Sequence, residues 1–281
     1  MLYLKLSPSK VESIWDRFSH ENMTPDEYRK AIDDGTFVCP DNPKVRDCDN
    51  GDVACDSYNQ YKRDIKLIKD LGVKHYRFSL AWTRICPDGY CQKINQKGID
   101  FYKTFITELK ANGIEPFVTL YHWDLPQVLQ DERGGWADEK ADEPGVGINM
   151  AFKKYAEVCF DNFGDQVKQW ITFNEAEVVT DLGYGYGVFA PGIADEKQKW
   201  RARHNTVRSH SEAVASYRAK GQGGIIGITI NTDHYIPASN SANDVKAADL
   251  QVILNSHSKI ESFLLVRTSS WFLGRANLWK W

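Results

Sequence analysis

The stretch Trp170-Ile171-Thr172-Phe173-Asn174-Glu175 decides the fold of this 281-residue chain. A β-rich and mostly apolar run ends here abruptly in an amide and a carboxylic acid. The charged group therefore lies at the exit of a predicted strand. In barrel enzymes the carboxyl ends of the strands hold the reacting groups, so this stretch predicts both a strand and a candidate site.

The same local pattern occurs four times along the chain. Each unit has a helix with apolar residues at helical spacing, a glycine, and a short apolar strand. The glycines lie where a helix C-terminus favours a left-handed residue. The first helix is predicted to start at Asp56, a good N-cap, and the fourth to cover roughly 200–220. The helices end at Gly72, Gly113, Gly164 and Gly221, and strands follow at 73–80, 116–121, 167–173 and 225–230.

Successive helix–strand units predict parallel strands joined by crossover helices. The strands are apolar on both faces, which predicts burial on both sides. A doubly wound sheet and a (β/α) barrel both give this pattern. No strand-to-helix loop carries the glycine-rich phosphate fingerprint, and long loops at 82–95, 122–149 and 175–199 favour a barrel. A whole barrel takes about 250 residues, yet only four strands can be placed, so we expect a partial (β/α)8 TIM barrel.

Polar side chains gather at the predicted strand ends, which would share one rim of such a barrel. Taken singly, each has a structural explanation: a lone structural His, a buried ion pair, core rings or a helix cap. Their shared location favours a site for a neutral, polyhydroxylated ligand. No thiolate or multiple-His cluster indicates a metal, and we expect no cofactor. The residues concerned are Arg77, Trp82, His122, Trp123, Asn174, Glu175 and, after the fourth strand, Asn231 and Asp233.

Composition excludes several classes of protein. Apolar residues make up 42% and charged residues 26%, which is ordinary for a globular protein. The net charge of −3 and the lack of a basic stretch argue against nucleic-acid binding. No run approaches the roughly 20 apolar residues of a membrane span, and the N-terminus does not resemble a signal peptide. The 35 aromatic residues predict a large core, with some rings lining a sugar cleft.

Five of the six cysteines lie in the first third of the chain. Cys39 with Cys48, and Cys86 with Cys91, flank short loops and could close disulfides, which would imply an oxidising compartment. Free thiols in a cytosolic protein are an equal alternative. The sequon at Asn22, although followed by proline, slightly favours secretion over a cytoplasmic location.

Several ordered motifs resemble glycoside hydrolase family 1, the family of β-glucosidases, lactase-type enzymes and myrosinases. The resemblance runs over 14–250, and 251–281 reads as a divergent tail. It implies strands two to five of the family barrel. The motifs are Asp56-Ser57-Tyr58, Tyr76-Arg77-Phe78-Ser79, Trp82-Thr83-Arg84-Ile85, Leu120-Tyr121-His122-Trp123-Asp124-Leu125-Pro126 and Thr172-Phe173-Asn174-Glu175, with Asn95-Gln96-Lys97-Gly98 and Ala190-Pro191-Gly192.

The resemblance implies a retaining mechanism that uses two glutamates on β-glycoside substrates. Glu175 matches the general acid/base, and Asn174 matches the amide that holds the sugar 2-hydroxyl. His122 matches a ligand of the glycone hydroxyls, with Trp123 beside it. Arg77 matches the arginine that orients the nucleophilic carboxylate.

The sequence also departs from the family pattern. The Ile/Val-Thr-Glu-Asn-Gly motif of the nucleophile is absent, as are the first strand with its sugar-binding glutamine and the late glycone-binding Glu and Trp. Ala176 replaces the proline that usually follows the acid/base. Without the nucleophile's charge, the acid loses the repulsion that keeps it protonated, and no covalent intermediate can form. We therefore expect a family fragment, truncated at both ends, that does not turn over β-glucosides alone.

Two alternatives remain open at this stage. The chain could be a non-catalytic member that binds sugars or protein partners, or a gene-model or splice fragment with no independent function. Four strands without the rest of a barrel leave two open edges, which predicts poor solubility or association with a complementary partner. Glycone and aglycone specificity and the oligomeric state do not follow from the sequence.

Overall fold

A computed structural model describes residues 10–231 and 235–250 of the chain. These residues fall into two compact units that divide between Thr229 and Ile230. The predicted tail at 251–281 and the polar pair Thr232-Asp233 lie outside the described residues. In the second unit a helix over 242–250 follows Ser241, whose hydroxyl accepts a hydrogen bond from the Asp244 amide at 3.1 Å. No helix within the described ranges is long and apolar enough to cross a bilayer.

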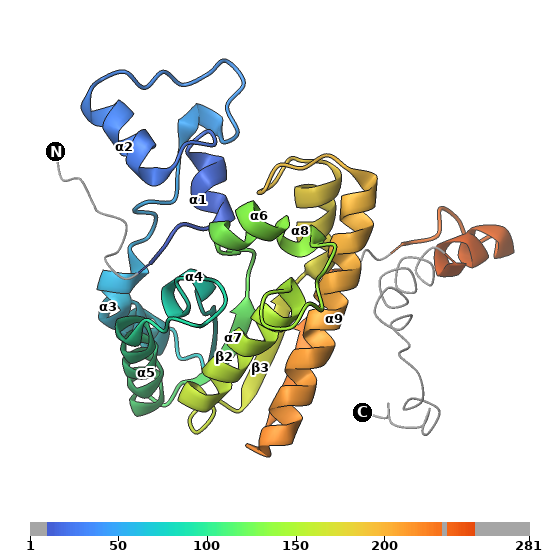
Figure 1. The fold of residues 1–281 in the computed structure, drawn as a ribbon. Coiled ribbons are helices and arrows are strands. Elements are labelled where there is room, and N and C mark those ends of the chain that lie inside the picture. Colours follow the sequence, from blue (N-terminus) through green and yellow to red (C-terminus); the bar gives the residue numbers. More distant parts are fainter. Residues whose placement is uncertain (1–9, 232–234, 251–281) are drawn as a thin grey trace. The chain divides into compact units, whose positions relative to one another are not determined.

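The first unit alternates helices and strands in chain order (Figure 1). Its strands are β1 (His75–Ser79), β2 (Glu115–Tyr121), β3 (Gln169–Asn174) and β4 (Ile225–Thr229). The helices are α1 (Ile14–Ser19), α2 (Pro25–Asp33), α3 (Ser57–Asp70), α4 (Trp82–Ile85), α5 (Gln96–Ala111), α6 (Gln127–Arg133), α7 (Ile148–Phe163), α8 (Ala176–Thr180) and α9 (Glu196–Lys220). Short 3-10 turns occupy η1 (Arg46–Cys48) and η2 (Gly135–Ala137), and a π-type turn occupies η3 (Asp181–Gly185).

The four strands form one parallel sheet in the order β1-β2-β3-β4. Each strand therefore pairs with its sequence neighbour, as in a (β/α) barrel, and the doubly wound alternative is excluded. Phe78 pairs with Val118, and Val118 with Trp170. Between β3 and β4 the register shifts between Ile171 and Asn174, which is next to the candidate site.

Aromatic rings fill the layer between the sheet and the helices. Trp82 is fully buried and stacks on Tyr155 of α7, with ring centroids 4.9 Å apart. Phe152 packs on Phe173 of β3 at 4.5 Å. Helices α5, α7 and α9 run beside the strands (Figure 1) and supply the outer wall of this layer. Burial of such large rings is the main favourable term for the fold.

The two outer strands are less covered than the sequence predicts. The central strands β2 and β3 are buried almost throughout, but β1 alternates between exposed and half-buried residues, and β4 has no fully buried residue. The prediction of burial on both faces is therefore right for β2 and β3 and wrong for β1 and β4. The reason is that each outer strand has only one strand neighbour among the described residues.

Three details of the helix ends differ from the sequence-based predictions. Asp56 adopts a left-handed conformation, and its carboxylate binds the Asn59 side chain at 2.7 Å instead of capping the helix. Gly164 is not left-handed (φ −69°); a side chain there would collide with Gln222. Helix α9 starts at Glu196, earlier than predicted, because Asp195 accepts hydrogen bonds from the first free amides.

Both predicted cysteine pairs are joined in the structure. Cys39 is bonded to Cys48, and Cys86 to Cys91, which closes two short loops. Cys159 on α7 is a buried free thiol, and Cys55 is an exposed one. The oxidising location that these bonds imply remains a prediction.

The exposed sheet edge generates a testable prediction about solubility. Ile225 starts β4 and is 64% exposed, so we expect Ile225→Lys to raise the fraction of soluble monomer, because edge charges oppose strand-to-strand association. Val38→Lys is the matched control, since Val38 is 81% exposed but lies in a loop. Size-exclusion chromatography with light scattering measures the result. Equal gains from both variants would show that added charge, and not the edge, controls association.

Candidate active site

Glu175 leaves β3 in an uncommon backbone conformation. Its φ of 44° and ψ of 62° are left-handed, which costs a non-glycine residue roughly 1–3 kcal/mol. The Glu175 amide donates to Thr229 O on β4 at 3.0 Å and thereby holds this turn. The side chain makes no capping hydrogen bond to α8. The simple explanation of Glu175 as a helix cap is therefore excluded, and its carboxyl group is left for the rim.

Asn174 is the most tightly held residue of the site. Its side chain is 5% exposed, and its Oδ1 accepts from Arg77 Nη2 at 2.5 Å and from Thr229 Oγ1 at 3.3 Å. Arg77 in turn donates from Nε to Thr119 Oγ1 at 3.0 Å. Strands β1, β2, β3 and β4 thus each contribute one side chain to the network that orients this amide.

The segment after β2 brings His122 and Trp123 to the same place. The Trp123 indole N–H donates to the backbone carbonyl of Asn174 at 2.7 Å. Trp123 itself has a left-handed φ of 79°. The His122 ring lies 5.2 Å from the indole, edge to face. Partial burial of the ring lowers the pKa of His122, the Arg77 charge lowers it further, and the Glu175 carboxylate opposes them. His122 thus lies within electrostatic range of both Arg77 and Glu175.

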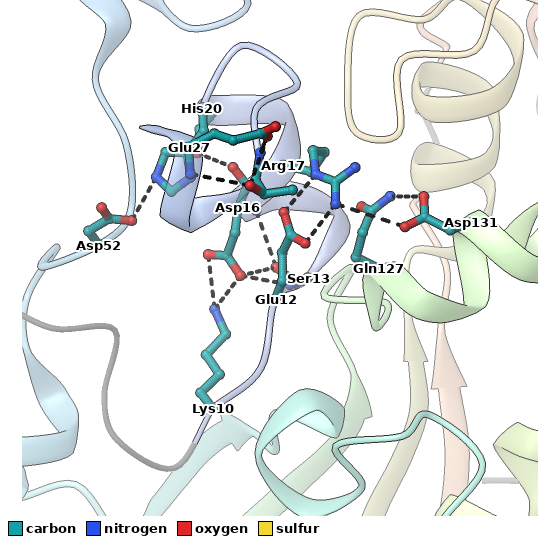
Figure 2. Close-up of polar contacts among 12 residues, drawn as sticks. Lys10, Glu12, Ser13, Asp16, Arg17, His20, Glu27, Asp52, Gln127 and Asp131 are labelled. Atoms are coloured by element: carbon teal, nitrogen blue, oxygen red, sulfur yellow. Dashed lines mark hydrogen bonds and ion pairs between the residues drawn. The ribbon is translucent and has the colours of Figure 1, made fainter. Parts of the chain in front are cut away.

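The N-terminal segment fastens this loop from outside. Ile14 N donates to Leu125 O at 2.9 Å, and Gln127 N donates to Glu12 O at 3.0 Å. Side chains strengthen the junction (Figure 2): Arg17 forms a two-point ion pair with Glu12, at 2.7 and 2.8 Å. The loop that carries His122 is therefore held at both its ends, by β2 and by α1.

Further charges surround the same junction. Lys10 Nζ lies 2.9 Å from Asp16 Oδ2 (Figure 2), and Asp16 also accepts from the Ser13 amide at 2.7 Å, as an N-terminal capping box requires. Arg17 also approaches Asp131 at 3.8 Å, and Gln127 binds the same carboxylate at 2.7 Å. The segment from Lys10 to Arg17 is thus tied both to itself and to α6.

Asp124 follows His122 and Trp123 in the same loop and is partly exposed as a whole residue. Its Oδ1 is sealed from solvent without a hydrogen-bond partner among the described residues. Burial raises the pKa of Asp124 to about 7, while the nearby Lys10 charge opposes this rise. This environment favours the neutral form of the carboxyl group compared with an exposed aspartate.

The predicted site residues separate into two groups. Arg77, His122, Trp123, Asn174 and Glu175 come together, whereas Trp82 is a core ring whose indole binds Gly89 O at 3.1 Å. Sequence reasoning missed Thr119 and Thr229, which hold Arg77 and Asn174. Their one sequence signal is a hydroxyl near the end of an otherwise apolar strand. In the described ranges no group of three or more His, Cys, Asp or Glu could hold a metal ion.

A parallel (β/α) sheet with an Asn-Glu pair at a strand exit, whose asparagine binds an arginine, is the arrangement expected of barrel-type glycoside hydrolases. The chain belongs to glycosyl hydrolase family 1, whose family model matches residues 7–264. The resemblance inferred from the motifs is therefore confirmed, and so is the partial barrel.

Known relatives show the same family at the level of whole sequences. The chain is 44% identical to β-glucosidase A of Acetivibrio thermocellus over 245 residues, which is 87% of this chain and 48% of that protein. It is 42% identical to furostanol glycoside 26-O-β-glucosidase of Hellenia speciosa over 84% of this chain and 40% of that protein. The structure of Thermotoga maritima β-glucosidase with glucoimidazole matches with a TM-score of 0.73 at 43% identity, over 89% of this chain and 50% of that one. The chain thus spans about half the length of these relatives.

Two buried titratable groups give a prediction about stability and pH. Burial lowers the pKa of His210 on α9 to about 4, so the unfolded chain binds this proton at higher pH than the folded chain. The free energy of unfolding should therefore fall as pH decreases from about 6.5 to 4, by up to about 1.4 kcal/mol per unit. Asp124 has the opposite sign: its raised pKa means that stability falls as pH rises from about 4 to 7.

Urea unfolding between pH 4.5 and 7.5 separates the two contributions. His210→Asn should remove the decrease in the free energy of unfolding at acidic pH, so that this free energy rises less steeply with pH than in the unsubstituted chain. Asp124→Asn should remove the decrease in the free energy of unfolding that accompanies a rise in pH, so that this free energy rises more steeply with pH than in the unsubstituted chain. If both substitutions changed the pH dependence of the unfolding free energy in the same direction, the environment described for either His210 or Asp124 would be wrong.

Proposed function

We propose that this chain carries the acid/base and sugar-binding part of a retaining β-glycosidase site. The observation that carries the proposal is the fixed amide of Asn174. Its oxygen is occupied by Arg77 and Thr229, so the group that can meet a sugar hydroxyl is the Nδ2 amide. An amide donor held at the exit of β3, beside Glu175, fits the 2-hydroxyl contact of a β-glycoside.

The residues divide the chemistry in a definite way. Glu175 would donate a proton to the glycosidic oxygen as the bond to the aglycone breaks, and would later accept one from water. His122 and the half-buried ring of Trp123 would bind the glycone hydroxyls and its apolar face. The left-handed backbone of Glu175 keeps the carboxyl group out of the α8 cap and available to substrate.

The second carboxylate sets the limit of this proposal. A retaining site needs two carboxyl groups about 5–5.5 Å apart, and the nucleophile motif does not occur in this sequence. Arg77, which the family resemblance assigns to the nucleophile, here donates to Asn174. We therefore propose that residues 1–281 by themselves bind glycosides without forming the covalent intermediate.

The relatives support a sugar-like ligand. Structures of the Thermotoga maritima β-glucosidase contain deoxynojirimycin or castanospermine, among other sugar-like compounds. That enzyme is 44% identical to this chain, which covers 50% of its length. A β-glucoside or related β-glycoside is thus the substrate class that we propose.

Calorimetry with deoxynojirimycin tests the binding part. We expect the unsubstituted chain to bind it and Asn174→Ala to weaken binding by about tenfold or more, as expected for a lost hydrogen bond in a partly buried site. Asn162→Ala is the matched control, because Asn162 lies on α7 and binds only Val158 O. Equal affinities for the Asn174 and Asn162 variants would exclude this site.

Turnover of nitrophenyl β-glucoside tests the catalytic part. The chain alone should release no more nitrophenol than its Glu175→Gln variant, because neither can form a glycosyl-enzyme intermediate. Clear release by the unsubstituted chain, lost in the variant, would show that another carboxylate of this chain acts as nucleophile.

A further inference from the structure

The strand that delivers Asn174 and Glu175 does not alternate regularly. In a regular strand, residues two apart face the same side of the sheet, so Thr172 and Asn174 should share a face. In this structure Thr172 contacts His210 on the helix side, whereas Asn174 contacts Arg77 of β1. The register shift between Ile171 and Asn174 accounts for the change of face.

Thr172 is fastened on the helix side immediately before the change. Its side chain is fully buried, and Oγ1 lies 2.7 Å from His210 Nδ1 and 3.1 Å from Gly227 O of β4. A hydroxyl has a single hydrogen, which here goes to the Gly227 carbonyl. The oxygen therefore accepts the hydrogen of His210 Nδ1.

Beyond the change of face, Thr229 holds the other end. Its hydroxyl shares one hydrogen between Phe173 O and Asn174 Oδ1, each 3.3 Å from Oγ1, and its carbonyl accepts the Glu175 amide at 3.0 Å. The irregular stretch from Ile171 to Asn174 thus has two side-chain attachments to β4, one within it at Thr172 and one at its end. Of the two, only the Thr172 attachment also reaches α9.

We infer that His210 is a positioning residue of this site, acting through Thr172. The pair fixes β3 against α9 and β4 just before the strand changes face, so that Asn174 and Glu175 project to the rim. Strand irregularities beside active sites commonly re-aim a side chain in this way. This role rests on the proposed function, because the residues that it positions are the proposed acid/base and amide. His210 itself would not touch the substrate.

Amide hydrogen exchange at Glu175 tests the inference directly. Thr172→Val keeps the shape and deletes the hydroxyl, and should speed exchange of the Glu175 amide by about tenfold, the effect of one lost hydrogen bond. Thr172→Ser keeps the hydroxyl and should restore protection. Thr206→Val is the matched control, since Thr206 is a buried threonine of α9 that binds only Arg203 O.

Gluconolactone affinity and the His210 ring complete the test. Thr172→Val should weaken gluconolactone binding by about the same factor as it speeds exchange of the Glu175 amide. Nitrogen NMR should show His210 protonated at Nδ1 in the unsubstituted chain, and a mixture of the two ring tautomers in this variant. If Thr172→Val unfolds, two variants of His210 replace it. His210→Leu deletes the donor and should speed exchange of the Glu175 amide, whereas His210→Asn keeps a donor near the Nδ1 position and should preserve its protection.

The outcomes distinguish this inference from the proposed function. Faster Glu175 exchange in Thr172→Val but not in Thr206→Val supports the positioning role, even when no form of the chain binds gluconolactone; the absence of binding would count against the proposed function alone. Unchanged Glu175 exchange in Thr172→Val, or loss of protection in the control as well, would overturn the positioning role.

Discussion

The hydrogen bond from Arg77 to Asn174 is the constraint on which the site depends. It joins β1 to β3 across the intervening β2, with Thr119 holding the arginine midway. Such a contact is possible only if Asn174 faces the same side of the sheet as Arg77. The register shift of β3 meets this requirement, and the core on the other side keeps Phe173 against Phe152. One local irregularity therefore serves both the packing and the site.

Much of the architecture follows from the sequence because it rests on local chemistry. Glycine after an amphipathic helix, then a short apolar run, specifies each helix–strand unit, and all four strands lie where this pattern places them. The errors have physical causes as well. Gly164 is small because Gln222 packs on it, not because it needs a left-handed backbone. The exposure of β1 and β4 depends on strand neighbours, which residue pattern alone does not report.

The site was predictable to a different degree. Charged and amide residues at strand exits can be read from the sequence, since parallel strands bring their carboxyl ends to one edge. Thr119, Thr172 and Thr229 could not be identified in this way, because a threonine near a strand end is also ordinary β-structure. Their importance arises from partners between 38 and 56 residues away in the chain, which only the folded structure brings near.

Two of the nine left-handed non-glycine residues in the described part of the chain lie at strand exits, next to the proposed site. These two residues are Trp123 and Glu175, and burial raises the pKa of Asp124, which directly follows Trp123 in the chain. Each is unfavourable in isolation. They persist because the structure around them leaves little freedom to relax. Phe152 packs on Phe173 beneath the site, and the backbone hydrogen bonds of Glu12 and Ile14 hold the loop after β2. In the proposed site the four strands thus fix the Asn174 amide, and α1 fixes the loop that carries His122 and Trp123.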